Sequence, residues 1–271
     1  PVPMAQTGSS ERYRSFVRSA HAAGLRVFAL SGYPWFTVSP RAGVPDQPTS
    51  QLEGWSVYSS LVASGLFDGL VDDSSPFETD FLRADGSRGN YFWSETAKAS
   101  ADYLEWLAGL ERIAGPLPYV QAVPMWFDSD PRLGALTLEG ERRARPLSWY
   151  VARHADVTNV LAYRDTAAAI LSGARGELAL GPTLIGVETL DLGPELAQVT
   201  FFEEGLDAME RELDSVWRSV RRESNFQGFS VHHYGSVRTL DEARARRAQV
   251  IYHAKGGGAA QRRDPRPSGR R

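Results

Sequence analysis

Residues 66–76 read LFDGLVDDSSP, a short apolar run that ends in acidic and hydroxyl side chains and then breaks at a proline. A run of this length and composition predicts a buried strand. Pro76 marks its end, because proline cannot donate a ladder hydrogen bond. The carboxyl end of this strand therefore leads into polar side chains, among them Asp72 and Asp73.

The same unit of helix, short strand and polar strand end recurs along the chain. Besides the opening stretch, strands are expected at about residues 26–30, 119–127, 157–165, 182–189 and 228–234. Helices are expected at about residues 11–23, 52–64, 91–114, 147–155, 166–176, 202–223 and 240–252. Residues 74–90 are expected to form a long polar loop.

Strands that alternate with helices predict parallel βαβ units, either in an open doubly wound sheet or in a closed barrel. No strand is followed by a Gly-rich phosphate-binding sequence, which argues against a dinucleotide-binding sheet. Polar residues at most strand ends favour an α/β fold of the (β/α)8 TIM-barrel type. Only six strands are found, and the deficit lies at the front. We therefore expect a barrel domain over residues 9–252 that lacks its first two strands, followed by a disordered basic tail over residues 253–271.

Composition limits the function classes. The chain has 271 residues, of which 42% are hydrophobic, enough for one large domain with a full core. A net charge of −3 gives no electrostatic reason to expect nucleic acid as a partner. The absence of cysteine excludes disulfides and thiolate metal sites, and no apolar run is long enough for a membrane span.

The first residues, PVPM, lead into a polar segment without the pattern of a signal peptide. A start at Pro1 indicates a processed or truncated chain. The compartment and the oligomeric state stay open, and a secreted or periplasmic location with the N-terminal region missing is one interpretation.

Alternation of side chains along the strands predicts which residues face the barrel interior. In the last strand, Ser230, His232 and Tyr234 should face inward, and Phe229, Val231 and His233 should face the helices. In the strand at 182–189, Ile185 and Val187 face outward, so that Glu188 points to the mouth.

Three more strands contribute to the same mouth. Asn159 marks an inner set that includes Tyr163 and Asp165, and Gln121 would direct Met125 inward. Asp73 shares a face with Gly69, Val71 and Ser75. The expected ring of polar residues at the mouth is Asp73, Tyr163, Asp165, Glu188, His232 and Tyr234.

Each of these residues also has a purely structural interpretation. Asp73 or Asp165 could pair with Arg164, and Glu188 could belong to a buried ion pair. The neighbouring His232 and His233 suggest a metal at first sight, but adjacent strand residues point to opposite faces and cannot chelate one ion. We therefore expect neither a metal nor another cofactor.

The opening stretch resembles the fourth-strand signature of chitinase-like glycoside hydrolases of family eighteen, in which Phe-Asp-Gly is followed by alternating acids that end in Asp-x-Glu. The segment AYRD at 162–165 looks like the family's Met-x-Tyr-Asp element, and GFSV at 228–231 looks like its final strand. A closer likeness is to uncharacterised bacterial barrel proteins that carry Phe-Asp-Gly-Ile, Pro-x-Trp-Phe-Asp, Met-Ala-Tyr-Arg-Asp, Gly-Val-Glu-Thr and a final His-x-Tyr. The resemblance covers about residues 20–235, and it numbers the strands here as three to eight.

One departure from the family pattern concerns its general acid. The position of the signature's final Glu holds Ser75, and the first inner acid position holds Val71, so that only Asp73 keeps an acid. In the family, the Asp positions the substrate's acetamido group and the Glu protonates the leaving oxygen. Glu78 lies three residues beyond Ser75 on a loop.

Three functions remain open. The first is a glycoside hydrolase in which Asp73, Glu188 and Asp165 supply the acid and base, since glycosidases need two carboxyl groups across the scissile bond. Its glycan would contact Tyr163, Arg164, His232 and Tyr234 and would stack on Trp35 and Trp126. The second is a carbohydrate-binding barrel that has lost catalysis, which Ser75 favours. The third is a structural or interaction protein whose acids only pair with arginine.

Overall fold

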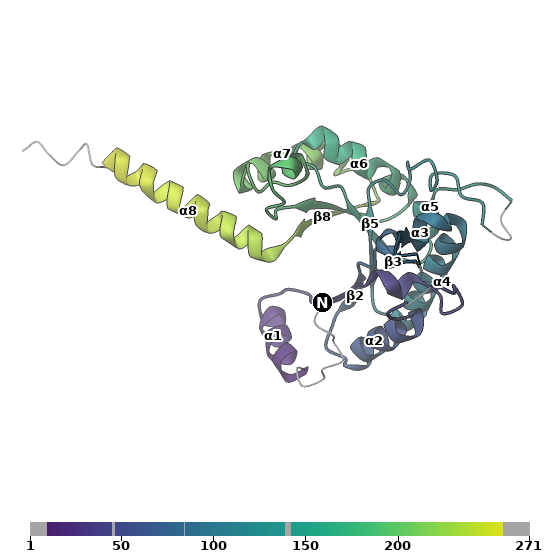
Figure 1. The fold of residues 1–271 in the computed structure, drawn as a ribbon. Helices are drawn as coiled ribbons and strands as arrows, with labels where there is room; N and C mark the ends of the chain where they lie inside the picture. Colours follow the sequence, from purple (N-terminus) through teal and green to yellow (C-terminus); the bar gives the residue numbers. More distant parts are fainter. Residues whose placement is uncertain (1–9, 45–46, 84, 139–141, 257–271) are drawn as a thin grey trace, which may run out of the picture.

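The computed structural model describes residues 10–44, 47–83, 85–138 and 142–256. Its main feature is one curled parallel sheet of six strands (Figure 1). In spatial order the strands are β1 (Phe28–Ser31), β2 (Gly69–Asp72), β5 (Tyr119–Pro124), β6 (Val157–Leu161), β7 (Thr183–Glu188) and β8 (Phe226–His232). This order follows the chain, and every neighbouring pair is parallel. The fold is an incomplete (β/α)8 barrel, which confirms the predicted fold class.

Helices cover the convex face of the sheet (Figure 1). They are α2 (Gln51–Ala63), α4 (Thr96–Ala114), α5 (Leu147–Val151), α6 (Ala167–Leu180) and α7 (Leu206–Val220). Helix α1 (Ser10–Ala22) precedes β1, and α8 (Tyr234–Gly256) follows β8 and extends away from the body (Figure 1). Short 3₁₀ turns lie at η1 (Pro34–Thr37), η2 (Pro76–Glu78) and η3 (Pro194–Val199). From α2 to α8 each of these helices packs against the next along the chain. The apolar core fills the space between this helix layer and the sheet.

Helix α4 shows how the sequence pattern produces this core. Tyr103, Leu107, Leu110 and Ala114 recur at helical spacing, and all four side chains are buried. The fully buried ring of Trp106 lies on the same helix and stacks on Trp55 of α2 at a centroid distance of 6.1 Å. This face of α4 therefore packs into the hydrophobic core.

Asp72, at the end of β2, is a fully buried carboxyl group that points into the helix layer. It accepts hydrogen bonds from the Tyr58 hydroxyl (2.7 Å), the Ser74 hydroxyl (2.8 Å) and the Trp106 indole N–H (3.1 Å). Burial raises the pKa of Asp72 and these hydrogen bonds oppose the rise, leaving its pKa above the ordinary value. Alternation along the strand then places Asp73 on the opposite, concave side.

Gly186 of β7 has no side chain, which allows a side chain of β6 and one of β8 to form a hydrogen bond over it on the concave side. Ser230 Oγ of β8 donates a hydrogen bond to Asn159 Oδ1 of β6 at 2.7 Å, and a Cβ on Gly186 would lie 3.1 Å from that Oγ and 3.3 Å from that Oδ1. The predicted inward positions of Asn159 and Ser230 are confirmed. Ile185 and Val187, which flank Gly186, are fully buried among the helices, also as predicted.

Replacing Gly186 by alanine is therefore expected to lower the free energy of unfolding by about 1–3 kcal/mol, because the added methyl crowds the Val160 carbonyl at 3.0 Å and the Ser230 hydroxyl. Gly181→Ala is the matched control, since the nearest atom to its Cβ would be the Ala152 Cβ at 3.9 Å, an ordinary contact. Urea unfolding of both variants measures the difference. Equal stabilities of the two variants would show that the inner face of β7 accommodates a methyl group without strain.

The side chains of Gln121 and Met125 on and after β5 point to the opposite side of the sheet from the one predicted. Gln121 lies in the helix layer, where its side-chain N–H donates to the Asp72 backbone carbonyl (3.2 Å) and its oxygen accepts from the Tyr119 hydroxyl. Met125 lies on the same helix side of the strand and packs against Gly173 of α6. A Cβ added to Gly173 would lie 2.7 Å from the Met125 sulfur. The prediction that Gln121 directs Met125 into the barrel was wrong, because a polar side chain can find its partners on the helix side of a strand.

A hairpin occupies part of the segment that was expected to be loop. Strands β3 (Asp80–Leu82) and β4 (Arg88–Asn90) pair antiparallel, and Gly86 takes the positive φ of +80° in their connection. Strands of three residues are too short to show a period-2 pattern, and the alternation of side chains could not reveal them.

Two helix boundaries also differ. The helix expected over residues 91–114 is divided into α3 (Tyr91–Ser94) and α4, because Glu95 between them has a non-helical ψ of 46°. The helix expected over residues 240–252 begins at Tyr234, directly after β8, and continues to Gly256. Residues 257–271 of the predicted tail lie outside the described residues.

The barrel is open between its first and last strands. Within the described ranges, β1 pairs only with β2, and β8 pairs only with β7. Leu30 on β1 is 61% exposed and Val231 on β8 is 40% exposed. Helix α8 extends away from the body at this side (Figure 1), which explains why Val231 lacks the helix cover expected for its position.

Candidate active site

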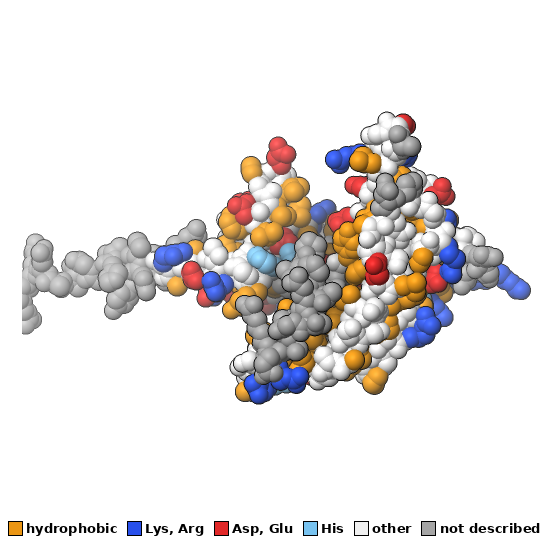
Figure 2. Space-filling view, turned by 60° about the horizontal axis from the view of Figure 1, so that its bottom comes forward, with side chains coloured by type: hydrophobic (Ala, Val, Ile, Leu, Met, Phe, Trp, Pro, Cys, Tyr) orange, Lys and Arg blue, Asp and Glu red, His pale blue; other side chains and the backbone are white. Residues whose placement is uncertain are grey.

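Three ionisable residues come together at the carboxyl ends of the strands. Asp73 directly follows β2, Glu188 ends β7, and His232 ends β8 as the register partner of Glu188. The carboxyl ends of parallel strands form one edge of the sheet, and in barrels this edge is where active sites lie. Figure 2 shows histidine side chains at the surface near the start of α8, beside acidic side chains.

Glu188 and His232 form a hydrogen-bonded pair. Glu188 Oε2 lies 2.7 Å from His232 Nδ1, and Glu188 Oε1 accepts the backbone N–H groups of Thr189 (2.7 Å) and Leu190 (2.8 Å). The side chain of Glu188 is 5% exposed, whereas that of His232 is 53% exposed. Because a carboxylate can only accept, Nδ1 of His232 carries the proton of this bond.

The pair shifts the pKa of both residues. Burial raises the pKa of Glu188, but the hydrogen bonds from His232, Leu190 and Thr189 outweigh burial and bring it below the ordinary value. The hydrogen bond to Glu188 raises the pKa of His232, burial opposes that rise, and the charges of Glu188 and Asp73 add to it. The pair therefore favours an ionised carboxylate beside an imidazolium.

Asp73 is the free carboxyl group of the mouth. Its backbone N–H donates to the Ser31 carbonyl at 2.9 Å, but no donor among the described residues contacts its carboxylate. The side chain reaches solvent, yet protein atoms surround much of the carboxyl group. This burial is the main reason why the pKa of Asp73 rises to about 6; the charges of Asp72 and Glu78 add to the rise, and that of His232 opposes it.

Tyr163 completes the cluster, and Arg164 and Asp165, which follow it in the chain, lie beside it. Its ring stacks on His232 at a centroid distance of 6.3 Å and an interplanar angle of 22°. Burial, Glu188 and Asp73 raise the pKa of its hydroxyl, which stays protonated. Arg164 donates to the Tyr163 carbonyl at 2.6 Å and, in the described part of the chain, makes no ion pair with Asp73 or the half-buried Asp165.

Trp126 belongs to an aromatic cluster beside the segment that follows Asp73. Its half-buried ring lies 5.0 Å from Phe77 of η2 and 5.7 Å from Trp93 of α3, measured between ring centroids. The Arg132 guanidinium lies 3.7 Å above the Trp93 ring. Phe77 and Trp93 were not predicted from the sequence, because the direction of the aromatic run at 91–93 depends on the break between α3 and α4 at Glu95.

Two predicted ligand residues take other positions. Trp35 is 7% exposed and packs in the hydrophobic core, so that its ring has no open face for a sugar. Tyr234 is 78% exposed and begins α8, outside the strand whose alternation was expected to direct it inward. The strand ends two residues earlier than predicted, at His232.

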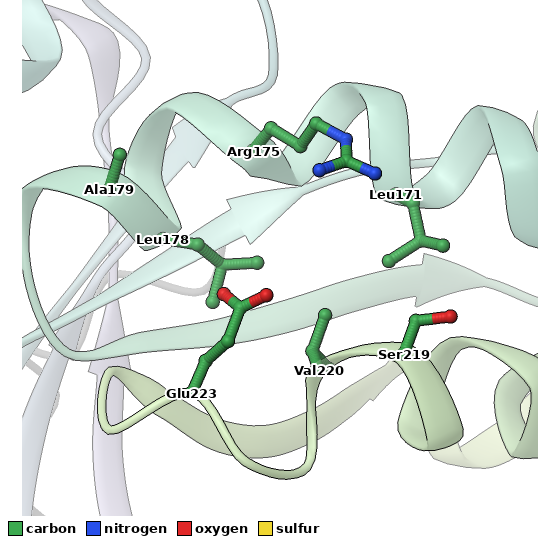
Figure 3. A pocket seen from close by; sticks show the side chains of 7 residues that line it. All are labelled: Leu171, Arg175, Leu178, Ala179, Ser219, Val220 and Glu223. Atoms are coloured by element: carbon green, nitrogen blue, oxygen red, sulfur yellow. The ribbon is translucent and has the colours of Figure 1, made fainter.

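A separate cavity of about 270 Å³ lies between α6 and α7, away from the strand ends. Leu171, Leu178 and Val220 line it, with Arg175 on the α6 side and Glu223 just beyond α7 (Figure 3). Because it lies in the helix layer, none of the residues at the mouth contributes to it.

Two further properties concern metals and membranes. Within the described residues, no group of three or more histidine or acidic side chains could hold a metal ion. No helix in that part of the chain is both long and apolar enough to cross a membrane.

Comparison with known proteins assigns no family. No protein-family model matches the chain, and no curated protein matches it. Among solved structures, a chitinase from Chromobacterium violaceum is similar with a TM-score of 0.39 and 9% identity over 65% of this chain and 53% of its own. A protein from Toxoplasma gondii assigned as a deoxyribose-phosphate aldolase is similar with a TM-score of 0.40 and 13% identity over 86% of this chain and 78% of its own. The chain spans about half the length of the chitinase, and neither likeness carries an activity over to it.

Proposed function

We propose that this barrel is a glycoside hydrolase that cleaves a polysaccharide or oligosaccharide by acid/base catalysis at the carboxyl ends of its strands. The observation that carries the proposal is Asp73, a carboxyl group that no donor among the described residues contacts and that faces the Glu188–His232 pair across one mouth. Burial raises the pKa of this carboxyl to about 6. A group that titrates near neutral pH is suited to proton transfer under physiological conditions.

Hydrolysis of a glycoside needs one group to protonate the leaving oxygen and another to activate water or to attack the sugar. Asp73 occupies the one acid position of the chitinase-like signature that this chain keeps. Glu188 was expected to be its free partner. In the structure Glu188 accepts three hydrogen bonds, and its charge is committed to His232. The working pair is therefore Asp73 and the combined Glu188–His232 unit.

A glycan is the substrate that the surroundings suit best. Trp126 and Phe77 place aromatic rings beside the chain that follows Asp73, and sugar rings bind such apolar faces through their C–H groups. The Tyr163 hydroxyl and the Arg164 guanidinium add hydrogen-bond donors for sugar hydroxyls.

Release of reducing sugars from a panel of polysaccharides tests the proposal. Asp73→Asn is expected to lower the rate at least about 100-fold, because the amide can neither take up nor release a proton. Asp85→Asn, on the exposed turn between β3 and β4, is the matched control and should keep the parent rate. Release that persists in Asp73→Asn would contradict the assignment.

A second candidate function is a carbohydrate-binding barrel without catalysis. Ser75 at the position of the motif acid and the engagement of Glu188 by His232 favour it. In that case a glycan binds without being cleaved, and Trp126→Ala weakens its binding while Asp73→Asn does not. The third function, with acids paired only to arginine, finds no support at Asp73.

A further inference from the structure

We propose that His232 is the general acid of this site and that Glu188 is the residue that positions it. The inference rests on the proposed function and deepens it, since it names the group that donates the proton in place of the motif acid missing at Ser75. It moves the acid from the end of β2 to the end of β8, across the open mouth.

The geometry separates the two nitrogens of the His232 ring. Nδ1 is held by Glu188 at 2.7 Å, whereas no described protein group hydrogen-bonds to Nε2. A hydrogen bond at one ring nitrogen fixes the orientation of the ring and leaves the other nitrogen available for proton transfer. Because the His232 side chain is 53% exposed, its free side can be reached from the mouth.

Glu188 itself is a poor candidate for the acid. Its side chain is 5% exposed, and both of its oxygens are taken by donors, from His232 on one side and from Thr189 and Leu190 on the other. A carboxylate held in this way is ionised and has no proton to give. What it can do is hold a positive charge on its neighbour, as a triad carboxylate does for its histidine.

Four side chains surround the His232 ring, and two of them are carboxylates. Glu188 of β7 and Asp73 after β2 are the acids that face it, and the neutral Tyr163 ring stacks on it from the end of β6. The His233 ring lies 5.5 Å away, but its Nδ1 faces the Ser236 hydroxyl at 3.0 Å. Two carboxylates facing one imidazole favour its charged form, the form that can act as an acid.

His232 gives its Nε2 proton to the glycosidic oxygen as the bond from that oxygen to the anomeric carbon breaks. The Asp73 carboxylate takes a proton from the water whose oxygen forms the new bond to that carbon. Exchange with solvent then returns a proton to His232 and removes one from Asp73, which restores the starting state.

Leaving-group dependence provides the sharpest test. His232→Gln is expected to lower cleavage of a natural oligosaccharide at least about 100-fold. Cleavage of a 2,4-dinitrophenyl glycoside, whose leaving group needs no proton, should fall by less than about fivefold. His233→Gln is the matched control and should cleave both substrates at the parent rate. Equal losses on both substrates in His232→Gln, or no loss on either, would overturn the acid role.

The positioning role of Glu188 has a readout that does not depend on activity. NMR titration of the imidazole should show the pKa of His232 falling in Glu188→Gln, with the alkaline limb of the rate profile moving to lower pH by the same amount. An unchanged His232 titration would overturn the role of Glu188. Failure of the parent protein to cleave any glycoside would overturn the proposed function, and the acid role with it, while the titration still decides whether Glu188 controls His232.

Discussion

Asp72→Ala is expected to lower the free energy of unfolding by about 3–5 kcal/mol, a large share of the stability of an ordinary domain. The alanine removes the acceptor for the Tyr58 hydroxyl, the Ser74 hydroxyl and the Trp106 indole N–H. Tyr58 can turn to the Ser31 carbonyl at 2.8 Å, but Trp106 is fully buried and loses its one acceptor among the described residues. A buried donor without a partner costs about 1–3 kcal/mol by itself.

Asp72→Asn separates the lost hydrogen bonds from the lost volume. The amide keeps the shape of the side chain and one acceptor oxygen, so the free energy of unfolding should fall less in this variant than in the alanine variant. Asp214→Ala removes a carboxylate whose salt bridge to Arg218 on the exposed face of α7 should contribute little, and it should change stability by less than about 0.5 kcal/mol. Urea unfolding followed by Trp fluorescence measures all three variants. An alanine variant as stable as the parent would show that Asp72 is not needed to hold β2 against the helices.

Glu177→Gln is expected to make the protein more stable at neutral pH. Glu177 of α6 is 2% exposed, and neither of its oxygens has a hydrogen-bond partner among the described residues. Burial raises the pKa of this carboxyl to about 8, and the charge of Asp128 adds to the rise. The native protein therefore keeps Glu177 protonated at neutral pH, and the amide of glutamine is a close substitute for that uncharged acid.

The pH dependence follows from the direction of this shift. Below the unfolded-state pKa, close to 4.5, Glu177 is protonated in both the folded and the unfolded state, and its titration does not change the free energy of unfolding. As pH rises toward 8, the unfolded chain releases the proton while the folded protein retains it, and the free energy of unfolding falls. At pH 7 the glutamine variant should be more stable by up to roughly 3 kcal/mol, since each pKa unit corresponds to about 1.4 kcal/mol.

Urea unfolding of parent and variant at several values between pH 4.5 and 8 measures this effect. The two should be similar at the acid end and diverge as pH rises. Glu204→Gln, at an exposed position before α7, should follow the parent at every pH. A parallel course of Glu177→Gln and the parent would mean that Glu177 is ionised in the folded protein.

Much of the sheet could be predicted because its strands carry strong patterns. Ile185 and Val187 identify the outward face of β7. Asn159 identifies the inner face of β6, and Ser230 identifies that of β8. The pattern failed at Gln121, because a polar residue reports only that it needs partners, and Tyr119 and Asp72 supply them on the helix side. The hairpin β3–β4 was missed because its contacts are set by one turn rather than by periodicity.

The sequence places three of the candidate residues at one mouth, but it does not indicate how their side chains interact. Asp73, Glu188 and His232 were all assigned to one mouth from alternation alone. That Glu188 and His232 pair depends on the register between β7 and β8, which the sequence does not encode locally. Trp35 has the composition expected of a sugar platform, but its burial is decided by the packing of η1 against α2 and α4.

The open side of the barrel bears on how the purified protein behaves in solution. The outer edges of β1 and β8 present backbone N–H and C=O groups without strand partners in the described part of the chain, next to the exposed Leu30 and Val231. Such an edge can template pairing with another molecule. Self-association should therefore rise with concentration and fall when lysine replaces Leu30 or Val231, because a charged side chain at a sheet edge opposes the approach of a second strand.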